Sequence, residues 1–267
     1  MTELFTHTEQ NDSLANWLGV ESVALVREDL LPNGGGKKRR ALQDFSDGLN
    51  QINHLHLLSY AGSHTAFSMA QLQPELMVHL YGSHYGGGDY ERAMIKQLNN
   101  LPNMDQAVGS SLSMARKFYT NRMLAKNGHH FMKIGGSLDV DRQTDKAVSQ
   151  VVETLENEYH HFVAVASGNL LSAIHDQTEH VTGILTQPKA IRILKALSLK
   201  RARGLKQESL GKRMRMMRDI QDLTGALWDP IFMGTVFSYL KRQKQLPNRL
   251  CIWVTCPTGI DWIASED

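Results

Sequence analysis

The feature of this 267-residue chain that most limits its fold is a regular alternation of short apolar runs with helix-like stretches. The apolar runs have the length of strands and are bounded by turn-forming residues. Because strands that alternate with helices usually pair in parallel, the pattern predicts an α/β protein whose ligands lie at the carboxyl ends of its strands. Strands are expected at 23–26, 55–59, 77–81, 131–134, 162–166 and 252–255, and helices at 14–18, 41–51 and 65–72.

The composition predicts a protein that folds without disulfides or structural metal ions. Hydrophobic residues make up 42% of the chain, which is enough to bury a substantial core. Cys251 and Cys256 lie five positions apart, with no second cysteine pair and no histidine cluster at ligand spacing. The polar start and the absence of an apolar run of about 18 residues predict neither a secretory signal nor a membrane span. We therefore expect a soluble, cytoplasmic protein with no membrane partner and no metal site.

Positive charge is concentrated between Arg192 and Arg218, where ten basic residues stand against the single acid Glu208. Such a cluster can attract nucleic-acid phosphates, which makes a nucleic-acid-binding module one alternative for this chain. The basic residues alternate with Leu, Ile and Met, however, which is typical of a solvated amphipathic helix. We therefore expect no nucleic-acid partner.

The most informative stretch is a run of three glycines, 34–36, followed by Lys37 and the basic residues 38–40. Glycines allow the backbone to turn tightly before a helix, and the amides at a helix start favour anions. Lys37 is then a candidate reactive amine, since a Schiff-base lysine needs a depressed pKa that neighbouring cations or desolvation can supply. The alternative is a solvated basic turn or a polyanion-binding cluster.

This stretch resembles a segment of the aminocyclopropane-carboxylate deaminase and D-cysteine desulfhydrase family, which has "K-R-D/E-D-L" followed by "G-G-N-K-x-R-K-L". Residues 34–40 take the places of the second motif, with Gly36 where the family has Asn. The resemblance implies that Lys37 forms a Schiff base with pyridoxal 5'-phosphate, and Lys38 is the alternative if the register differs by one residue.

Further stretches resemble family motifs in the expected order along nearly the whole chain. They are "LANWLGV" at 14–20, "KIGGS" at 133–137, "TGALWDPIFMG" at 224–234, and the final strand with its turn at 255–259. The resemblance implies the fold of type II pyridoxal-phosphate enzymes, with two open α/β domains and the cofactor cleft between them. We expect residues 1–50 and 135–267 to form the large domain and residues 51–134 to form a smaller inserted one.

The resemblance assigns Ser63 and His64 to the substrate side of the site. After the strand at 55–59 the family has "G-G-x-x-S-N-H", whose serine lies near the substrate carboxylate and whose asparagine bonds the cofactor's phenolic oxygen. In one register Ser63 keeps the serine role and His64 takes the asparagine place. In the other register Ser63 itself takes the asparagine place. His64 is also a candidate general base, because imidazole titrates near neutrality, although a histidine that caps or packs at a helix start is equally common.

The resemblance also places the cofactor's phosphate and ring nitrogen, with departures from the family. Ser167, Gly168 and Asn169 replace the "G-S-G-G-T" phosphate loop and are followed by the bulky pair Leu170 and Leu171. Thr258 matches the hydroxyl residue that meets the pyridine nitrogen. Two substitutions complete the departures: Pro257 stands where the family has His, and Phe232 stands where a family tyrosine faces the substrate.

These residues imply a homodimeric pyridoxal-phosphate enzyme that acts on a small amino acid by α,β-elimination or deamination. A D-cysteine-like substrate fits better than the cyclopropane amino acid, because ring opening depends most on the tyrosine that Phe232 replaces. The alternative is a protein that keeps the fold but has lost turnover and serves a binding or regulatory role. The second alternative is the nucleic-acid-binding module.

Overall fold

The structure is a computed structural model, and its described part divides into two compact units. Unit 1 comprises residues 1–31 and 142–258, and unit 2 comprises residues 32–141 and 259–267. The segment 32–50 therefore groups with unit 2, whereas the expected domain ranges, which stay a prediction, place it with the large domain. The structure describes residues 6–32, 35–36, 38–47, 51–132, 142–155, 158–166, 168–186, 202–203 and 209–256.

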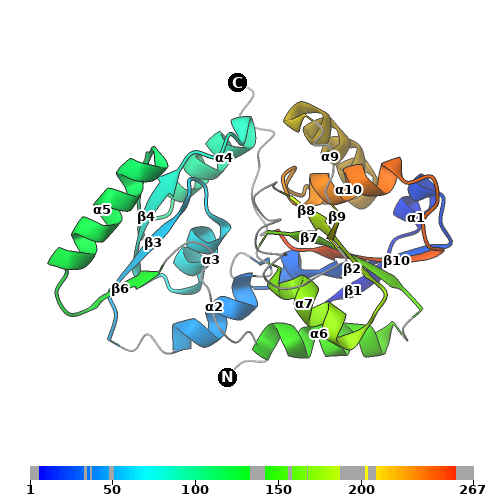
Figure 1. Ribbon diagram of the computed structural model, residues 1–267, viewed down its shortest axis with the longest axis horizontal. Helices are drawn as coiled ribbons and strands as arrows, with labels where there is room; N and C mark the ends of the chain where they lie inside the picture. The colour runs from blue at the N-terminus through cyan, green and yellow to red at the C-terminus, as the bar shows by residue number, and fades with distance from the viewer. Residues whose placement is uncertain are drawn as a thin grey trace. The chain divides into compact units, whose positions relative to one another are not determined.

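Unit 1 is built on a six-stranded sheet in which all the neighbouring strands pair in parallel except β1 and β2 (Figure 1). The strand order is β1 (Thr8–Gln10), β2 (Ser22–Arg27), β10 (Arg249–Val254), β7 (His160–Val165), β8 (Val181–Leu185) and β9 (Ala202–Arg203). Its helices are α1 (Asp12–Leu18), α6 (Arg142–Thr154), α7 (Asn169–Gln177), α9 (Leu210–Thr224) and α10 (Met233–Arg242).

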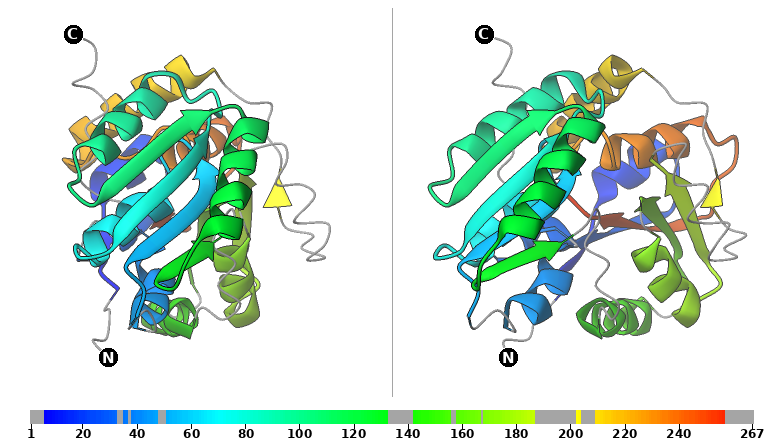
Figure 2. Two further views of the ribbon diagram at one scale, coloured as in Figure 1. Left: turned by 90° about the vertical axis from the view of Figure 1, so that its left-hand side faces the viewer. Right: turned by 60° about the vertical axis from the view of Figure 1, so that its left-hand side comes forward.

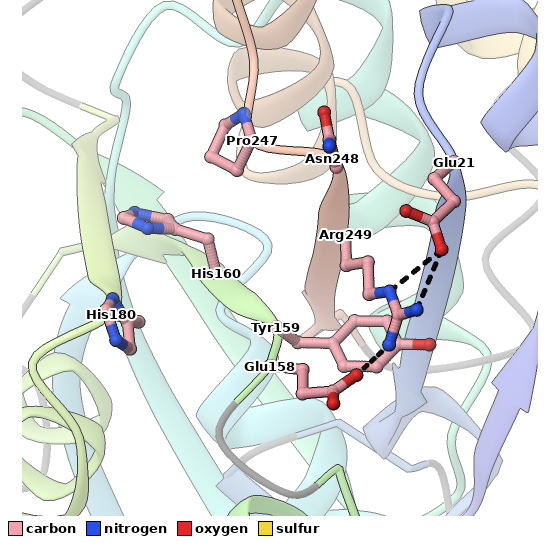
Figure 3. A pocket seen from close by; sticks show the side chains of 8 residues that line it. All are labelled: Glu21, Glu158, Tyr159, His160, His180, Pro247, Asn248 and Arg249. Atoms are coloured by element: carbon pink, nitrogen blue, oxygen red, sulfur yellow. Dashed lines mark hydrogen bonds and ion pairs between the residues drawn. The ribbon is translucent and has the colours of Figure 1, made fainter.

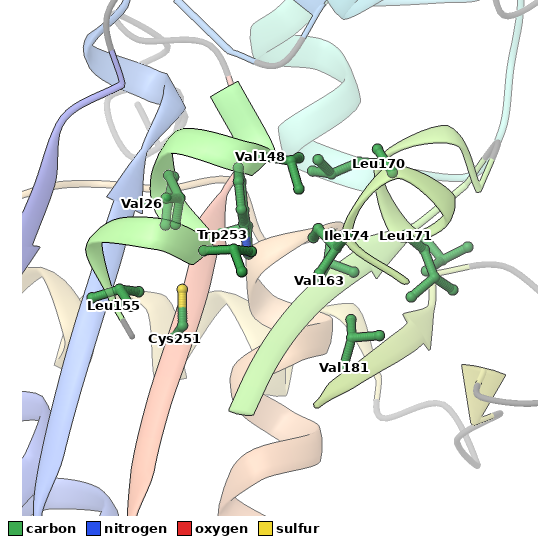
Figure 4. Close-up of a cluster of buried hydrophobic side chains, with 14 of the residues drawn as sticks. Val26, Val148, Leu155, Val163, Leu170, Leu171, Ile174, Val181, Cys251 and Trp253 are labelled. Carbon is green, nitrogen blue, oxygen red and sulfur yellow. The ribbon is translucent and has the colours of Figure 1, made fainter. Parts of the chain in front are cut away.

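The core of unit 1 is apolar because β2, β7 and β10 are buried along almost their full length. One cluster joins the sheet residues Val163 and Trp253 to Val148 of α6 and Ile174 of α7 (Figure 4). Near-continuous apolar strands of this kind are typical of a parallel sheet that is covered on both faces.

Unit 2 is built on a four-stranded parallel sheet of order β5 (Met104–Gly109), β4 (Met77–Ser83), β3 (His54–Tyr60) and β6 (His129–Met132). Its helices are α2 (Lys38–Asp47), α3 (His64–Leu72), α4 (Gly88–Asn99) and α5 (Ser111–Leu124). Leu42 of α2 and Phe67 of α3 pack with Leu55 and Leu57 on one face of the sheet. Helix α5 covers the other face (Figure 2). Met114 and Phe118 of this helix pack there with Tyr81.

The α5 face of this sheet carries a set of stacked, hydrogen-bonded imidazoles, which we call the histidine cluster: His54, His56, His79 and His129. Within this cluster, the ring of His54 stacks on that of His129, and the ring of His56 stacks on that of His79. The ring centroids lie 4.4 Å apart in both pairs. His56 Nε2 lies 2.9 Å from His129 Nδ1, and His54 Nδ1 lies 3.0 Å from His79 Nε2. Among the described residues, no three His, Cys, Asp or Glu side chains are placed to hold a metal ion.

The architecture confirms the α/β fold predicted from the alternating pattern, and each predicted strand overlaps an observed strand. The elements that the pattern missed include β1, β5, α4 and α5. Within the basic segment 192–218, the described part is mainly helix α9, which buries Met214, Met217 and Ile220. None of the described helices is long and apolar enough to cross a membrane.

Candidate cofactor and substrate site

The turn before the candidate lysine requires glycine at two described positions. Gly35 and Gly36 have φ angles of 61° and 78°, in the left-handed region that side chains other than Asn and Asp rarely adopt. Lys37 itself lies outside the described residues, and α2 begins at the next residue, Lys38. Because Asn also tolerates the left-handed region, Gly36 can replace the family's Asn without changing the course of the backbone.

The basic residues after Lys37 do not form a solvated turn. Arg39 and Arg40 are only 4% and 1% exposed. The Arg39 Nε donates a hydrogen bond to the carbonyl of Pro32 at 3.0 Å, which ties the start of α2 to a residue two positions before the glycines. Two guanidinium groups are therefore buried within one helical turn of the candidate amine, which argues against the simple basic-turn alternative.

Ser63 and His64 lie together at the carboxyl end of β3, where α3 begins. Ser63 is the N-cap of α3, since its hydroxyl accepts a hydrogen bond from the Ala66 amide at 3.4 Å. His64 is the first residue of the helix, and its Nε2 lies 2.7 Å from the Tyr90 hydroxyl. Neither register of the family motif is selected by these contacts, so both remain open.

The turn that carries Ser63 is closely packed against α4. Gly62 has a φ of 70°, and a Cβ at this position would lie 2.5 Å from the Cβ of Met94. Gly82 of β4 packs closely against the β3 turn, because a Cβ at this position would lie 2.8 Å from the Cα of Ala61. These glycines allow the β3 turn, β4 and α4 to approach closely, and they fix the position of the α3 start.

The glycine-rich loop 84–88 after β4 is held by a buried carboxylate that sequence reasoning missed. The side chain of Glu91, in the first turn of α4, is 6% exposed. It accepts hydrogen bonds from the Gly87 amide at 2.9 Å, the His84 Nδ1 at 2.8 Å and the Tyr85 amide at 3.4 Å. A Glu a few residues after a glycine run, in the first turn of a helix, is the signal that could have found this contact.

The predicted phosphate loop of unit 1 is a turn from β7 into α7, and the structure describes it in part. Ser167 lies outside the described residues, whereas Gly168 is the N-cap of α7 with a φ of 90° and no side-chain capping bond. Asn169 is exposed at the helix start. Leu170 and Leu171 are 5% and 1% exposed and belong to the apolar core of unit 1.

The first amides of α7 fit a phosphate group, since the described residues provide no side-chain cap and the helix dipole favours an anion there. Backbone amides at a helix start are the kind of donor that the phosphate of pyridoxal phosphate needs. Thr258 and Pro257, which would extend the site beyond β10, lie outside the described residues.

A buried carboxyl, Asp229, precedes the start of α10 in unit 1. Its Oδ1 accepts hydrogen bonds from the amides of Ile231 at 3.0 Å and Phe232 at 2.5 Å. Burial raises the pKa of Asp229 to about 6, although the backbone amides and Arg213 lower it in part. Phe232, half-buried, is the N-cap residue of α10 and brings no hydroxyl to this position.

A separate pocket of about 440 Å³ lies in unit 1 at the amino ends of β2, β7 and β10 (Figure 3). Arg249 pairs there with both Glu21 and Glu158. The residues of the predicted site do not line this pocket. The lining residues are Glu21, Glu158, Tyr159, His160, His180, Pro247, Asn248 and Arg249.

The structure thus brings some of the predicted residues together within each unit. In unit 2, Ser63 and His64 are adjacent, and α2, which follows Lys37, packs through Leu42 against α3. In unit 1, Gly168 and Asn169 form the start of α7. Lys37, Ser167 and Thr258 are outside the described residues, so their predicted roles stay predictions.

The fold is that of type II pyridoxal-phosphate-dependent enzymes, with two α/β units each built on a largely parallel sheet. The chain is similar to a solved aminocyclopropane-carboxylate deaminase homologue, with a TM-score of 0.70 and 17% identity over 94% of this chain and 89% of that one. No protein-family model and no curated protein sequence matches it.

Two further solved structures are similar over nearly their whole length. The O-acetylserine dependent cystathionine beta-synthase from Helicobacter pylori has a TM-score of 0.64 and 13% identity over 100% of this chain and 95% of that one. The hydrogen sulfide-producing enzyme from Fusobacterium nucleatum has a TM-score of 0.63 and 10% identity over 96% of this chain and 95% of that one. At these identities the similarity establishes the fold and not the activity.

Proposed function

We propose that this protein is a pyridoxal-phosphate-dependent enzyme that acts on a small amino acid by α,β-elimination or deamination. One observation carries the proposal: the left-handed glycines Gly35 and Gly36 lead directly into Lys37 and the start of α2, on a chain with the fold of type II enzymes of this cofactor. The names of two similar structures, a deaminase homologue and a hydrogen sulfide-producing enzyme, agree with these reaction classes.

The residues that would hold the cofactor follow from the sequence and from the described helix starts. The Lys37 amine would bind its aldehyde carbon, the amides at the start of α7 its phosphate, and the Thr258 hydroxyl its ring nitrogen. When bound, pyridoxal phosphate withdraws electrons from the Cα of the attached amino acid. Ser63 and His64 would then contact the substrate carboxylate and the cofactor's phenolic oxygen.

The role of this chain's own acid and base groups is to move protons. The Lys37 amine would take the proton from the substrate Cα, since a neutral amine is a base of suitable strength. His64 is the second candidate, because imidazole can accept or release a proton near neutral pH. Ser63 already uses its hydroxyl as the N-cap of α3, which keeps the α3 start ordered.

The proposed substrate is a D-cysteine-like or other small amino acid rather than the cyclopropane amino acid. Phe232, the N-cap of α10, stands at the place where the similar family has a tyrosine, and a phenyl ring cannot exchange a proton. Elimination of a good leaving group such as sulfide depends less on a proton-donating side chain at this position than opening a cyclopropane ring does. We also propose that the protein is a homodimer that binds neither membranes nor nucleic acids.

Two measurements test this proposal. Purified protein incubated with pyridoxal phosphate should develop a visible absorbance band, which Lys37→Ala should abolish and the neighbouring Lys38→Ala should retain. Across a panel of small D- and L-amino acids, the wild type should release ammonia with pyruvate, or sulfide from cysteine. A colourless wild-type protein, or a band that survives Lys37→Ala, would contradict the proposal.

A second candidate is a protein that binds the cofactor without turnover and serves a binding or regulatory role. Phe232 favours it, since the family's acid-base hydroxyl is absent at the start of α10. It predicts the absorbance band without product release from any member of the panel, so the same two measurements separate it from the enzyme.

A further inference from the structure

His64 forms a short polar contact with a tyrosine that the sequence did not single out. The Tyr90 hydroxyl lies 2.7 Å from His64 Nε2, and the two rings meet edge to face with centroids 6.3 Å apart and planes at 82°. Tyr90 is 1% exposed, whereas His64 is half-buried at the first position of α3. Tyr90 therefore contacts the imidazole from the protein interior, on the side away from solvent.

The surrounding residues hold Tyr90 in this position. It lies in the first turn of α4, next to Glu91, whose buried carboxylate binds the preceding loop through the Gly87 amide and His84. Gly62 lets α4 approach the β3 turn so closely that a Cβ there would meet Met94 at 2.5 Å. The contact between Tyr90 and His64 is thus part of a packed junction between α3 and α4, at the carboxyl edge of the unit 2 sheet.

A hydroxyl at this position has a property that a carboxylate or a phenyl ring lacks. It can donate a hydrogen bond to Nε2 when that nitrogen is unprotonated, and it can accept one from Nε2–H after a short rotation about its C–O bond. A carboxylate would favour only the charged imidazole, and a phenyl ring would bond neither form. Tyr90 can therefore hold the ring of His64 in one orientation through both protonation states.

We infer that Tyr90 is the positioning residue for His64: its hydroxyl fixes the imidazole ring at the start of α3 while His64 exchanges a proton with an amino-acid substrate. The proton that His64 accepts is the one the substrate loses, and His64 returns it to substrate, product or water, so no other reactant is needed. This inference deepens the proposed function and rests on it. It places the acid-base group at the start of α3 in unit 2.

The first test needs neither cofactor nor turnover. In ¹⁵N-histidine-labelled apoprotein, Tyr90→Phe should change the chemical shift of the His64 Nε2 on both sides of the ring's titration, because the hydroxyl bonds that nitrogen in both protonation states. Tyr159→Phe is the control, because its hydroxyl bonds Gln10 and Ser22 in unit 1. Unchanged His64 ring shifts in folded Tyr90→Phe would overturn the inference.

The second test uses the loaded enzyme. Loss of one neutral hydrogen bond predicts a fall in kcat of about 3- to 10-fold, with KM changed by less than about 2-fold and a moved pH–rate profile. In a His64→Gln background, Tyr90→Phe should have no further effect on kcat, because the group it positions is gone. Equal effects of Tyr90→Phe in both backgrounds would overturn the inference.

The outcomes separate the inference from the proposed function. A protein that does not bind pyridoxal phosphate fails the proposed function, while the apoprotein spectra still report whether Tyr90 fixes the His64 ring. An active enzyme whose His64 spectra and pH profile ignore Tyr90→Phe keeps the proposed function and loses the inference. Thermal unfolding of each variant confirms that the measured protein is folded.

Discussion

The sheets of the two units have similar parallel cores but very different second faces. In unit 1, side chains of α6 and α7 cover one face with an apolar cluster that includes Trp253, and the strands are buried nearly throughout. In unit 2, one face is apolar, but the α5 face carries the histidine cluster at the amino ends of its strands. Two units of one architecture should therefore respond differently to acid.

The physical cause is that the environment of two imidazoles of unit 2, the buried His56 and the half-buried His54, disfavours their charged forms. Burial lowers the pKa of His56 to about 4, with further lowering by the charges of His79 and His129, and burial also lowers the pKa of His54. A histidine whose pKa is lower in the folded state contributes stability above the unfolded pKa of 6.5. That stability is lost as the pH falls from 6.5 towards 4, since the unfolded state then binds more protons.

Unit 1 contains two buried groups whose effects oppose each other. Burial lowers the pKa of His161 to about 4, so its contribution is also lost as the pH falls below 6.5. Burial raises the pKa of Asp229 from 3.8 to about 6, so the folded state binds the extra proton first and gains relative stability as the pH falls through 6. The two effects largely cancel between pH 6.5 and 4.

The largest expected effect concerns the apolar core that distinguishes unit 1. Trp253 is 1% exposed within this cluster, so Trp253→Ala should cost about 3–5 kcal/mol of unfolding free energy through lost burial and a cavity. Urea unfolding monitored by circular dichroism measures the loss. Trp17→Ala, at a half-buried edge contact with Phe237, is the control and should cost clearly less. Equal losses would mean that the cluster around Trp253 is not the main core.

The next effect is acid sensitivity of the histidine cluster. Between pH 7 and 5 the shift of His56 alone predicts a loss of about 2 kcal/mol from unit 2. Peptide-level hydrogen exchange, corrected for its intrinsic pH dependence, should show β3, β4 and β6 losing protection before β7 and β10. His79→Asn removes one imidazole that disfavours protonation of His56 and should reduce the loss. Earlier loss in unit 1 would contradict the comparison.

A smaller effect tests whether Asp229 offsets the loss of stability that His161 causes in unit 1 as the pH falls. Asp229→Asn keeps an oxygen for the amides of Ile231 and Phe232 but removes the titrating group. Unit 1 should then lose about 1 kcal/mol more between pH 7 and 5 than it does in the wild type. Hydrogen exchange of β7 and β10 at the two pH values measures this difference. An unchanged pH dependence would show that Asp229 does not titrate in this range.

The smallest effect is expected for Gly36→Asn, in the turn before Lys37 in unit 2. Gly36 has a left-handed φ of 78°, which Asn tolerates and a β-branched side chain does not. Gly36→Asn should change the unfolding free energy by less than about 0.5 kcal/mol, and Gly36→Val should cost about 1–3 kcal/mol. Thermal unfolding of the pair checks the difference. A tolerated valine would mean that the turn has another conformation.

The sequence predicted those features that depend on local pattern. Apolar runs such as Val23–Val26 are buried strands, and the glycines at 35 and 36 mark the predicted turn into a helix. Strand β5 was missed because its residues are half-buried and mixed in character, and α5 was missed because it buries only Met114 and Phe118.

The contacts that could not be predicted join residues far apart in the chain. His56 and His129 are 73 positions apart, and they meet only because β3 and β6 pair in parallel with a particular register. The contact of Tyr90 with His64 likewise depends on the close approach of α4 that Gly62 permits. Neither contact leaves a periodic signal in the sequence, since each needs the tertiary fold to exist first.

Lys37 is the residue on which the proposed cofactor binding most depends. Reduction with borohydride after incubation with pyridoxal phosphate, followed by peptide mapping, locates any lysine that has been joined to it. We expect the reduced cofactor on Lys37 and an unmodified Lys38. A peptide map with no modified lysine, or with the modification on another lysine, would contradict the account.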